Sequence, residues 1–223
     1  MFSDLAVLAE GNNFARLLGG LGVSIEIALA SMALSIVFGT LMGVAMASKS
    51  KALKAVTQAY LQFVRIMPQL VLLFLVYFDA TRAWGLNLDA RLAAIIVFTL
   101  WGTAELGDLV RAAIESVPRH QYLSAAALGI EGRALYRHVV LPQALRGLVP
   151  ATINLTNRMI MTTSLVALIG VVEVLKVAQQ IIDANRFEYP SAALWIYGVV
   201  FLLYFLVCFP ISLAARKLEE RWS

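Results

Sequence analysis

Two groups of polar side chains lie inside apolar stretches of the sequence, where they could act on a charged ligand. The stretch 92–114 carries Glu105 and Asp108, and the stretch 148–172 carries Arg158 within a polar helical face. That face comprises Asn154, Asn157, Arg158 and Met161, spaced i, i+3, i+4 and i+7, and Thr162 continues it. Ionisable groups at membrane depth cost at least about 2.5 kcal/mol each, so they face a cavity or a partner. Arg158 could hold a carboxylate, and Glu105 or Asp108 an ammonium group.

Each of these charges also has a purely structural interpretation. Asp108 and Arg111 are three residues apart on one expected helix and could form an ion pair. Arg158 could equally neutralise Glu105 or Asp108 from a neighbouring helix. Glu26 lies close to the start of the first apolar stretch, which favours an interfacial side chain over a ligand. The residues alone leave these alternatives open.

The elements that must position these residues are membrane helices. The chain of 223 residues is 61% hydrophobic and only 14% charged, and its mean hydropathy is +0.80. A helix needs about 20 apolar residues to cross a bilayer. Five stretches reach that length: 21–47, 56–78, 92–114, 148–172 and 192–215. We therefore expect an all-α integral membrane protein with five transmembrane helices in a single domain, 1–223.

Smaller features refine this expectation. Residues 1–10 lack a basic leader pattern, so the first span is expected to remain as an anchor. Gly39 and Gly43 permit close helix packing, which we expect within the chain more than between two chains. The single cysteine, Cys208, rules out an internal disulfide bond.

The positive charges predict an orientation. Most of the 18 lysines and arginines lie on the side that holds the connection 116–146 and the C-terminus. This asymmetry favours a cytoplasmic connection, a cytoplasmic C-terminus and an external N-terminus. The net charge of +4 then reflects topology, and no interleaving of basic and aromatic residues indicates nucleic acid.

The connection 116–146 has features of a polar hairpin. Its alanine-rich part, 122–128, favours a helix, and Gly129 can take the left-handed conformation that ends one. Pro142 stops or starts a helix without an amide donor. We expect two short helices joined by a turn, from which Arg133, Arg137 and His138 project toward a soluble partner. The alternative is an ordinary loop with a solvated basic face.

The spacing of this hairpin resembles the "EAA" signature of ABC importer membrane subunits. In that signature the glycine, here Gly129, is followed by nine residues, an aliphatic residue, one more residue and Leu-Pro, here Leu141-Pro142. The chain is similar over nearly its whole length to the polar amino-acid uptake subfamily. Further matches are Arg65, Pro68, 108–111, 116–118, 141–146, 163–166, 169–173 and 218–221.

Three pairs of neighbouring residues depart from the family pattern. Leu123 and Ser124 replace the glutamate and alanine of the signature, while Ala125 is kept. Met161-Thr162 replaces a Lys-Asp pair, and Ile66-Met67 replaces Gly-Thr. The residues that the resemblance assigns to ATPase coupling are Leu123, Ser124, Ala125, Gly129, Arg133, Arg137, His138, Leu141 and Pro142. Because Leu123 removes an acidic contact, we expect Arg133, Arg137 and His138 to hold the partner.

The resemblance implies a type I ABC importer fold and a non-catalytic permease subunit in a bacterial cytoplasmic (inner) membrane. Its substrate would be a polar amino acid or a related small zwitterion, delivered by an external or periplasmic binding protein. The chain has no phosphate-binding loop, so ATP and magnesium are expected on partner ATPase subunits and no cofactor on this chain. A second permease chain, identical or different, would complete the pathway. Thr162 in place of an aspartate favours substrates that are not strongly cationic.

Two other functions remain possible from the residues alone. An ATP-independent channel or secondary carrier could use Glu105, Asp108 and Arg158 to move ions or protons. A non-transporting scaffold would fit if these charges neutralise one another. No catalytic or metal-binding constellation is evident, because His120 and His138 are far apart, so we do not expect an enzyme.

Overall fold

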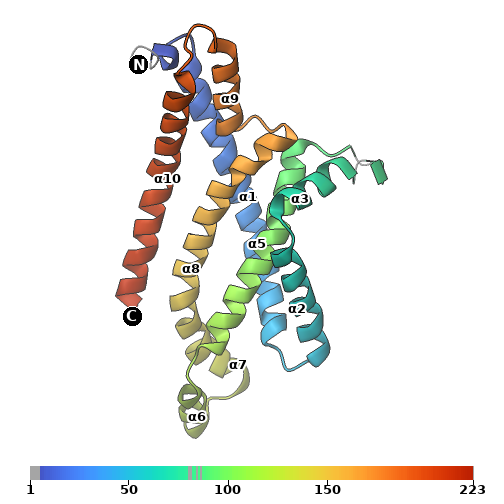
Figure 1. Cartoon of the computed structure of the whole chain (residues 1–223). Helices are drawn as coiled ribbons and strands as arrows, with labels where there is room; N and C mark the ends of the chain where they lie inside the picture. Colours follow the sequence, from blue (N-terminus) through green and yellow to red (C-terminus); the bar gives the residue numbers. More distant parts are fainter. Residues whose placement is uncertain (1–5, 80–81, 84, 86, 223) are drawn as a thin grey trace. The chain divides into compact units, whose positions relative to one another are not determined.

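A computed structural model describes residues 6–79, 82–83, 85 and 87–222, and their regular structure is helical (Figure 1). The long helices are α1 (Asn13–Ala47), α5 (Ala90–Glu115), α8 (Leu141–Thr162) and α10 (Ala192–Trp222). The shorter ones are α2 (Lys51–Ile66), α3 (Gln69–Phe74), α6 (Arg119–Ala127), α7 (Gly132–Leu135) and α9 (Val174–Asn185). Three helices could each cross a membrane, or up to five spans form if two bent pairs count as one span each. The expected five spans equal the upper end of this range. Residues 1–5, part of the segment in which no leader was expected, lie outside the described residues.

The chain forms two compact units, and each is assembled from three separate segments. The first unit comprises residues within 1–31, 68–98 and 158–210, and the second comprises 32–67, 99–157 and 211–223. The helices α1, α5, α8 and α10 each contribute residues to both units.

The core of the first unit lies where α9 packs against the first part of α1 and the first part of α10 (Figure 1). Its buried members are Val7, Leu17, Leu21, Val174, Val177, Ala178, Ile181, Ala192, Ile196, Val200 and Leu203. A Cβ atom at Gly20 would lie 2.8 Å from the Cα atom of Val174. The absence of a side chain at Gly20 therefore lets α1 approach the start of α9 closely.

In the second unit, glycines likewise allow α1 and α5 to pack closely. A Cβ atom at Gly39 would lie 2.8 Å from Leu106, and one at Gly43 would lie 2.5 Å from Val110. The two glycines therefore serve helix packing within the chain, which confirms the preferred sequence interpretation.

The prediction of one continuous helix over 56–78 is wrong, because the helix is interrupted near its middle. Helix α2 ends at Ile66, and Met67 takes extended torsion angles of −72° and 127°. After Pro68, α3 runs into a π-helical turn, η2 (Leu75–Asp79). A proline disfavours the helical conformation at the preceding residue and supplies no amide donor, which accounts for the break where Met67 is extended.

The predicted helix 148–172 differs in both its ends. Helix α8 begins at Leu141 and ends at Thr162, and a 3-10 stretch, η4 (Thr163–Ile169), follows it. Gly170 then turns the chain with a φ of +92° before α9 begins. The other spans are longer than expected: α1 starts at Asn13, where the polar Arg16 donates a hydrogen bond of 2.8 Å to Gln180 of α9.

Candidate functional site

The first half of the polar hairpin is a helix with a left-handed cap. Helix α6 ends at Ala127 with Leu128 as its C-cap, and Gly129 has a φ of +71°. The amide of Ile130 donates to the Ala125 carbonyl at 2.9 Å, and the amide of Gly129 donates to the Ala126 carbonyl at 3.0 Å. This pair of bonds is the Schellman motif, which needs a residue with positive φ. The expected left-handed helix end at Gly129 is confirmed.

The second half differs from the sequence expectation. A helix begins at Gly132, whose φ is +56°, and continues from α7 through a π-helical turn, η3 (Tyr136–Val140), into α8. Pro142 therefore lies in a continuing helix and neither starts nor stops one. The Leu141 amide donates to the Tyr136 carbonyl, five residues back. This wider turn accommodates the proline, which has no amide to continue the regular pattern. Sequence reasoning missed Gly132, although a second glycine so soon after Gly129 was a signal.

The base of the hairpin is packed, and its tip is exposed. Ala113, Val117, Val140 and Ala144 form a small buried core, against which Tyr122, Leu135 and Leu148 pack. In contrast, Leu123 is 66% exposed and Leu128 is 77% exposed. Arg133, Arg137 and His138 are also exposed. The hairpin thus presents apolar and cationic side chains from a fixed base.

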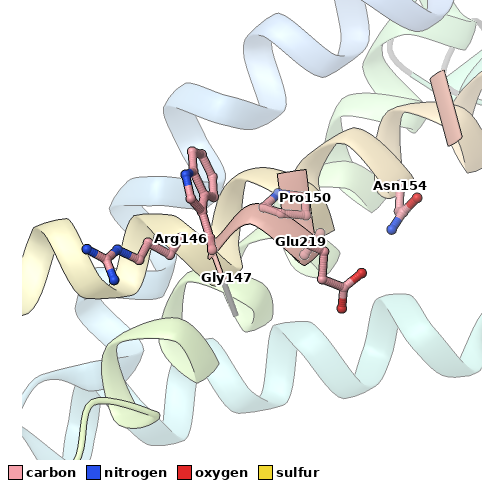
Figure 2. Close-up of a pocket in the computed structure, with 7 residues that line it drawn as sticks. Arg146, Gly147, Pro150, Asn154 and Glu219 are labelled. Atoms are coloured by element: carbon pink, nitrogen blue, oxygen red, sulfur yellow. The ribbon is translucent and has the colours of Figure 1, made fainter. Parts of the chain in front are cut away.

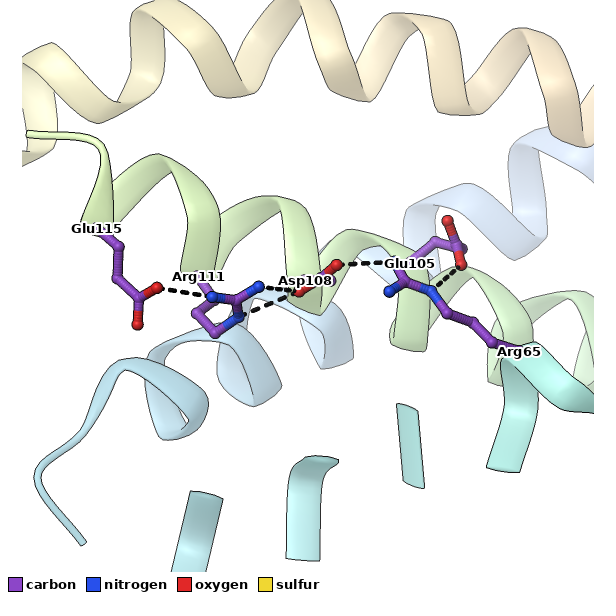
Figure 3. Close-up of polar contacts among 5 residues, drawn as sticks. All are labelled: Arg65, Glu105, Asp108, Arg111 and Glu115. Carbon is purple, nitrogen blue, oxygen red and sulfur yellow. Dashed lines mark hydrogen bonds and ion pairs between the residues drawn. The ribbon is translucent and has the colours of Figure 1, made fainter. Parts of the chain in front are cut away.

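The acids of α5 lie in a chain of ion pairs (Figure 3). The Nε atom of Arg65 lies 2.9 Å from the Glu105 carboxylate, and the Nη2 atom of Arg65 lies 2.7 Å from Asp108. Arg111 contacts Asp108 at 2.5 Å and Glu115 at 2.6 Å. The expected pair between Asp108 and Arg111 is confirmed, and Arg65 extends it to a second helix.

The sequence analysis missed the role of Arg65. It comes from α2, 40 residues before Glu105, and we noted it only as a match to the family pattern. An isolated arginine within a predicted span was itself a signal, since such a charge requires a partner. Because guanidinium groups already hold Glu105 and Asp108, a substrate ammonium group would have to compete with them.

The polar face of α8 is less uniform than its spacing predicts. Asn154 and Arg158 are exposed, and Met161 is 50% exposed. Thr162 donates its hydroxyl proton to the Arg158 carbonyl at 2.7 Å. Asn157 is only 5% exposed and donates to the Ser212 hydroxyl of α10 at 2.6 Å. Asn157 is therefore engaged in joining α8 to α10, which an i, i+3 spacing alone cannot reveal.

Asn154 lines a polar pocket of about 350 Å³ between α8 and the end of α10 (Figure 2). The other lining residues are Arg146, Gly147, Pro150, Ala151, Glu219 and Trp222. Figure 2 shows the side chains of Arg146 and Glu219 pointing in opposite directions. The pocket offers one group of each charge, together with the amide of Asn154.

A chain whose described residues form long apolar helices, with ion pairs between α2 and α5 and a capped polar hairpin, has the features of a membrane transport subunit. The chain belongs to the family of binding-protein-dependent transport system inner membrane components, whose model matches residues 21–223. It is 31% identical to the probable amino-acid ABC transporter permease protein YckA of Bacillus subtilis, over 95% of this chain and 91% of that protein. It is 30% identical to the L-cystine transport system permease protein TcyB of the same organism, over 91% and 85% of the two chains.

Solved structures share the fold. A crystal structure of an amino acid ABC transporter with histidines superposes with a TM-score of 0.85 at 23% identity, and 96% of this chain and 97% of that chain are covered. An inward-facing structure of the MetNI methionine ABC transporter gives a TM-score of 0.76 at 18% identity, over 94% and 97% of the two chains. The sequence prediction of an ABC permease subunit is confirmed. The ATP-independent channel or carrier is not supported.

Proposed function

We propose that the chain forms the membrane pathway of an ATP-driven importer for polar amino acids or related small zwitterions. The observation that carries this proposal is the capped hairpin, which holds exposed apolar and cationic side chains on a packed base. The relatives of this chain support polar amino acids as the substrate class, because they include a probable glutamine permease protein and an L-cystine permease protein. The hairpin would lie in the cytoplasm, where ATP is available, and the C-terminus on the same side.

The hairpin would couple transport to ATP hydrolysis on partner subunits. Leu123 and Leu128 offer apolar contacts in place of the family's glutamate, and Arg133, Arg137 and His138 offer exposed polar contacts on the following helix. Closure of two ATPase subunits on ATP would shift the permease between inward-facing and outward-facing states, a coupling between distant sites. A second permease chain and an external binding protein would complete the system.

We expect Gly129→Ala to weaken this coupling up to about tenfold. Alanine in the left-handed region costs about 1–2 kcal/mol, which would destabilise the cap that shapes the hairpin. The measurement is substrate-stimulated ATPase activity in proteoliposomes that contain the chain, its ATPase and its binding protein. Gly198→Ala is the matched control, because Gly198 is helical and a Cβ atom there would meet nothing within 4 Å. Full coupling in Gly129→Ala, with ATPase bound as in the wild type, would contradict the proposal.

We expect Arg158→Gln to lower uptake tenfold or more. A guanidinium that binds the substrate carboxylate makes a charge-assisted hydrogen bond of about 1.5–3 kcal/mol, which glutamine would weaken. Uptake of radiolabelled glutamine, histidine, arginine and cystine would be measured beside membrane insertion. Arg186→Gln serves as the control, since Arg186 is exposed and its guanidinium stacks on Phe187 at 4.5 Å. If the Arg158→Gln variant inserts normally and its uptake is unchanged, Arg158 does not bind the substrate.

A further inference from the structure

An apolar groove crosses the second unit between α1, α5 and α8, and the proposed transport pathway does not use it. Two adjoining cavities of about 600 and 340 Å³ make up the groove. Val44, Ile114, Leu141 and Ala144 line both cavities, so the two are continuous. Apart from Thr40 and Thr152, the residues that line the inner cavity are apolar.

The groove lies on the opposite side of α8 from the pocket in Figure 2. At 3.6 residues per turn, Leu141, Leu145 and Leu148 share one side of the helix, whereas Gly147 and Asn154 lie on the other. The apolar rim is open to the surroundings, because Val44 is 55% exposed and Leu141 is 52% exposed. In a membrane chain, such an open apolar face is in contact with lipid unless a protein covers it.

The mouth of the groove is cationic. Arg133 and Arg137 line the outer cavity together with Tyr136 and Ser48, close to the end of α1 at Ala47. Both arginines and Tyr136 are exposed. Among the residues that line either cavity there is no carboxylate to neutralise these charges. A phosphate group complements this mouth, and guanidinium groups bind phosphate oxygens well.

The dimensions of the groove distinguish a lipid chain from a helix. The apolar part of α8 that lines it, from Leu141 to Thr152, is about 17 Å long at about 1.5 Å per residue. One leaflet of a hydrocarbon core about 30 Å thick has nearly this depth. A helix about 10 Å wide and equally long would need about 1,300 Å³, whereas the two cavities together hold at most about 940 Å³.

We propose that this groove binds one anionic phospholipid. One of its acyl chains lies between α1, α5 and α8, and its phosphate binds Arg133 and Arg137 at the membrane surface. The site thus gives these two arginines a ligand that is separate from the ATPase. It depends on neither the transported substrate nor the polar face of α8.

The test measures the lipid that the permease retains when it is purified together with its ATPase. The complex would be loaded with a mixture of phosphatidylglycerol and phosphatidylcholine, and the bound lipid counted by native mass spectrometry. In Arg133→Gln/Arg137→Gln we expect about 25-fold weaker retention of phosphatidylglycerol, since each arginine near an anionic surface contributes about a factor of five. Val44→Phe should also reduce retention by filling the groove without removing a charge. Arg119→Gln is the control, because it removes a charge from α6 outside the groove and should retain lipid as the wild type does.

Each alternative predicts a different result. If Arg133 and Arg137 contact only the ATPase, the double variant loses ATPase but keeps its phosphatidylglycerol, which would overturn the proposal. Equal retention of phosphatidylcholine and phosphatidylglycerol would overturn the assignment of the phosphate site. If millimolar inorganic phosphate protects the arginines from chemical modification and phosphatidylglycerol does not, the site binds a free anion and the groove has no lipid. If Val44→Phe does not lower retention of phosphatidylglycerol, no acyl chain occupies the groove and the proposal is overturned.

Discussion

Glu173→Ala is expected to lower the free energy of unfolding by about 3–5 kcal/mol. The side chain of Glu173 is fully buried and accepts hydrogen bonds from the amides of Leu175 at 2.9 Å and Lys176 at 2.8 Å. The hydroxyl of Ser24 on α1 also donates to it, at 3.3 Å. Alanine would leave these donors buried without their acceptor, at about 1–3 kcal/mol each, and would remove the cap of α9.

Reversible unfolding in mixed micelles would measure this loss. Glu173→Gln retains one acceptor oxygen and should fall between the wild type and alanine, which separates hydrogen bonding from side-chain volume. Glu188→Ala is the matched control, because Glu188 is an exposed glutamate between α9 and α10. Faster amide exchange confined to α9 would locate the effect. A loss of less than about 1 kcal/mol in Glu173→Ala would show that Glu173 is not needed to hold α9 on α1.

Arg65→Gln is expected to cost about 2.5 kcal/mol of stability, the second large effect. Its guanidinium holds both Glu105 and Asp108 within helices that the chain places in the membrane (Figure 3). Without Arg65, the three carboxylates of this network share one guanidinium, Arg111. An uncompensated acid at a helix centre costs about 2.5–3.5 kcal/mol.

A second substitution tests whether charge is the cause. In Arg65→Gln/Glu105→Gln the numbers of cations and anions fall together, so we expect most of the lost stability to return. The control is Arg91→Gln, because the Arg91 pair with Glu26 is 4.0 Å long and more than half exposed on both sides. Such a surface pair is worth at most about 1 kcal/mol. If the double variant is no more stable than Arg65→Gln alone, shape and not charge explains the role of Arg65.

Both residues connect segments that are far apart in the chain. Glu173 lies 149 residues from Ser24, and Arg65 lies 43 residues from Asp108. Each contact lies within one compact unit. These polar contacts supplement the close helix packing at Gly20, Gly39 and Gly43. We therefore expect that the loss of a polar contact or of a glycine contact destabilises the unit that contains it.

Local features could be predicted from the sequence because short stretches of chain determine them. Hydropathy indicated that the long helices exist and placed α5 within about two residues of its observed ends, but it missed both ends of α8. The glycine cap at Gly129 and the i, i+3 pair of Asp108 and Arg111 depend on the backbone of one helix each. The break at Pro68 had the same kind of signal in the proline itself, but hydropathy averaged over 20 residues concealed it.

The class of protein and the glycine cap in the first half of its hairpin were therefore determined by sequence alone, since composition, glycine and spacing act over a few residues. Only the tertiary structure decided which groups meet. The tertiary structure pairs Asn157, an expected pathway residue, with Ser212, and it pairs Arg65 with the acids of α5. It also buries Glu173 at the start of α9, against Ser24 of α1. These outcomes depend on which faces of distant helices pack together, and neither periodicity nor charge along one helix carries that information.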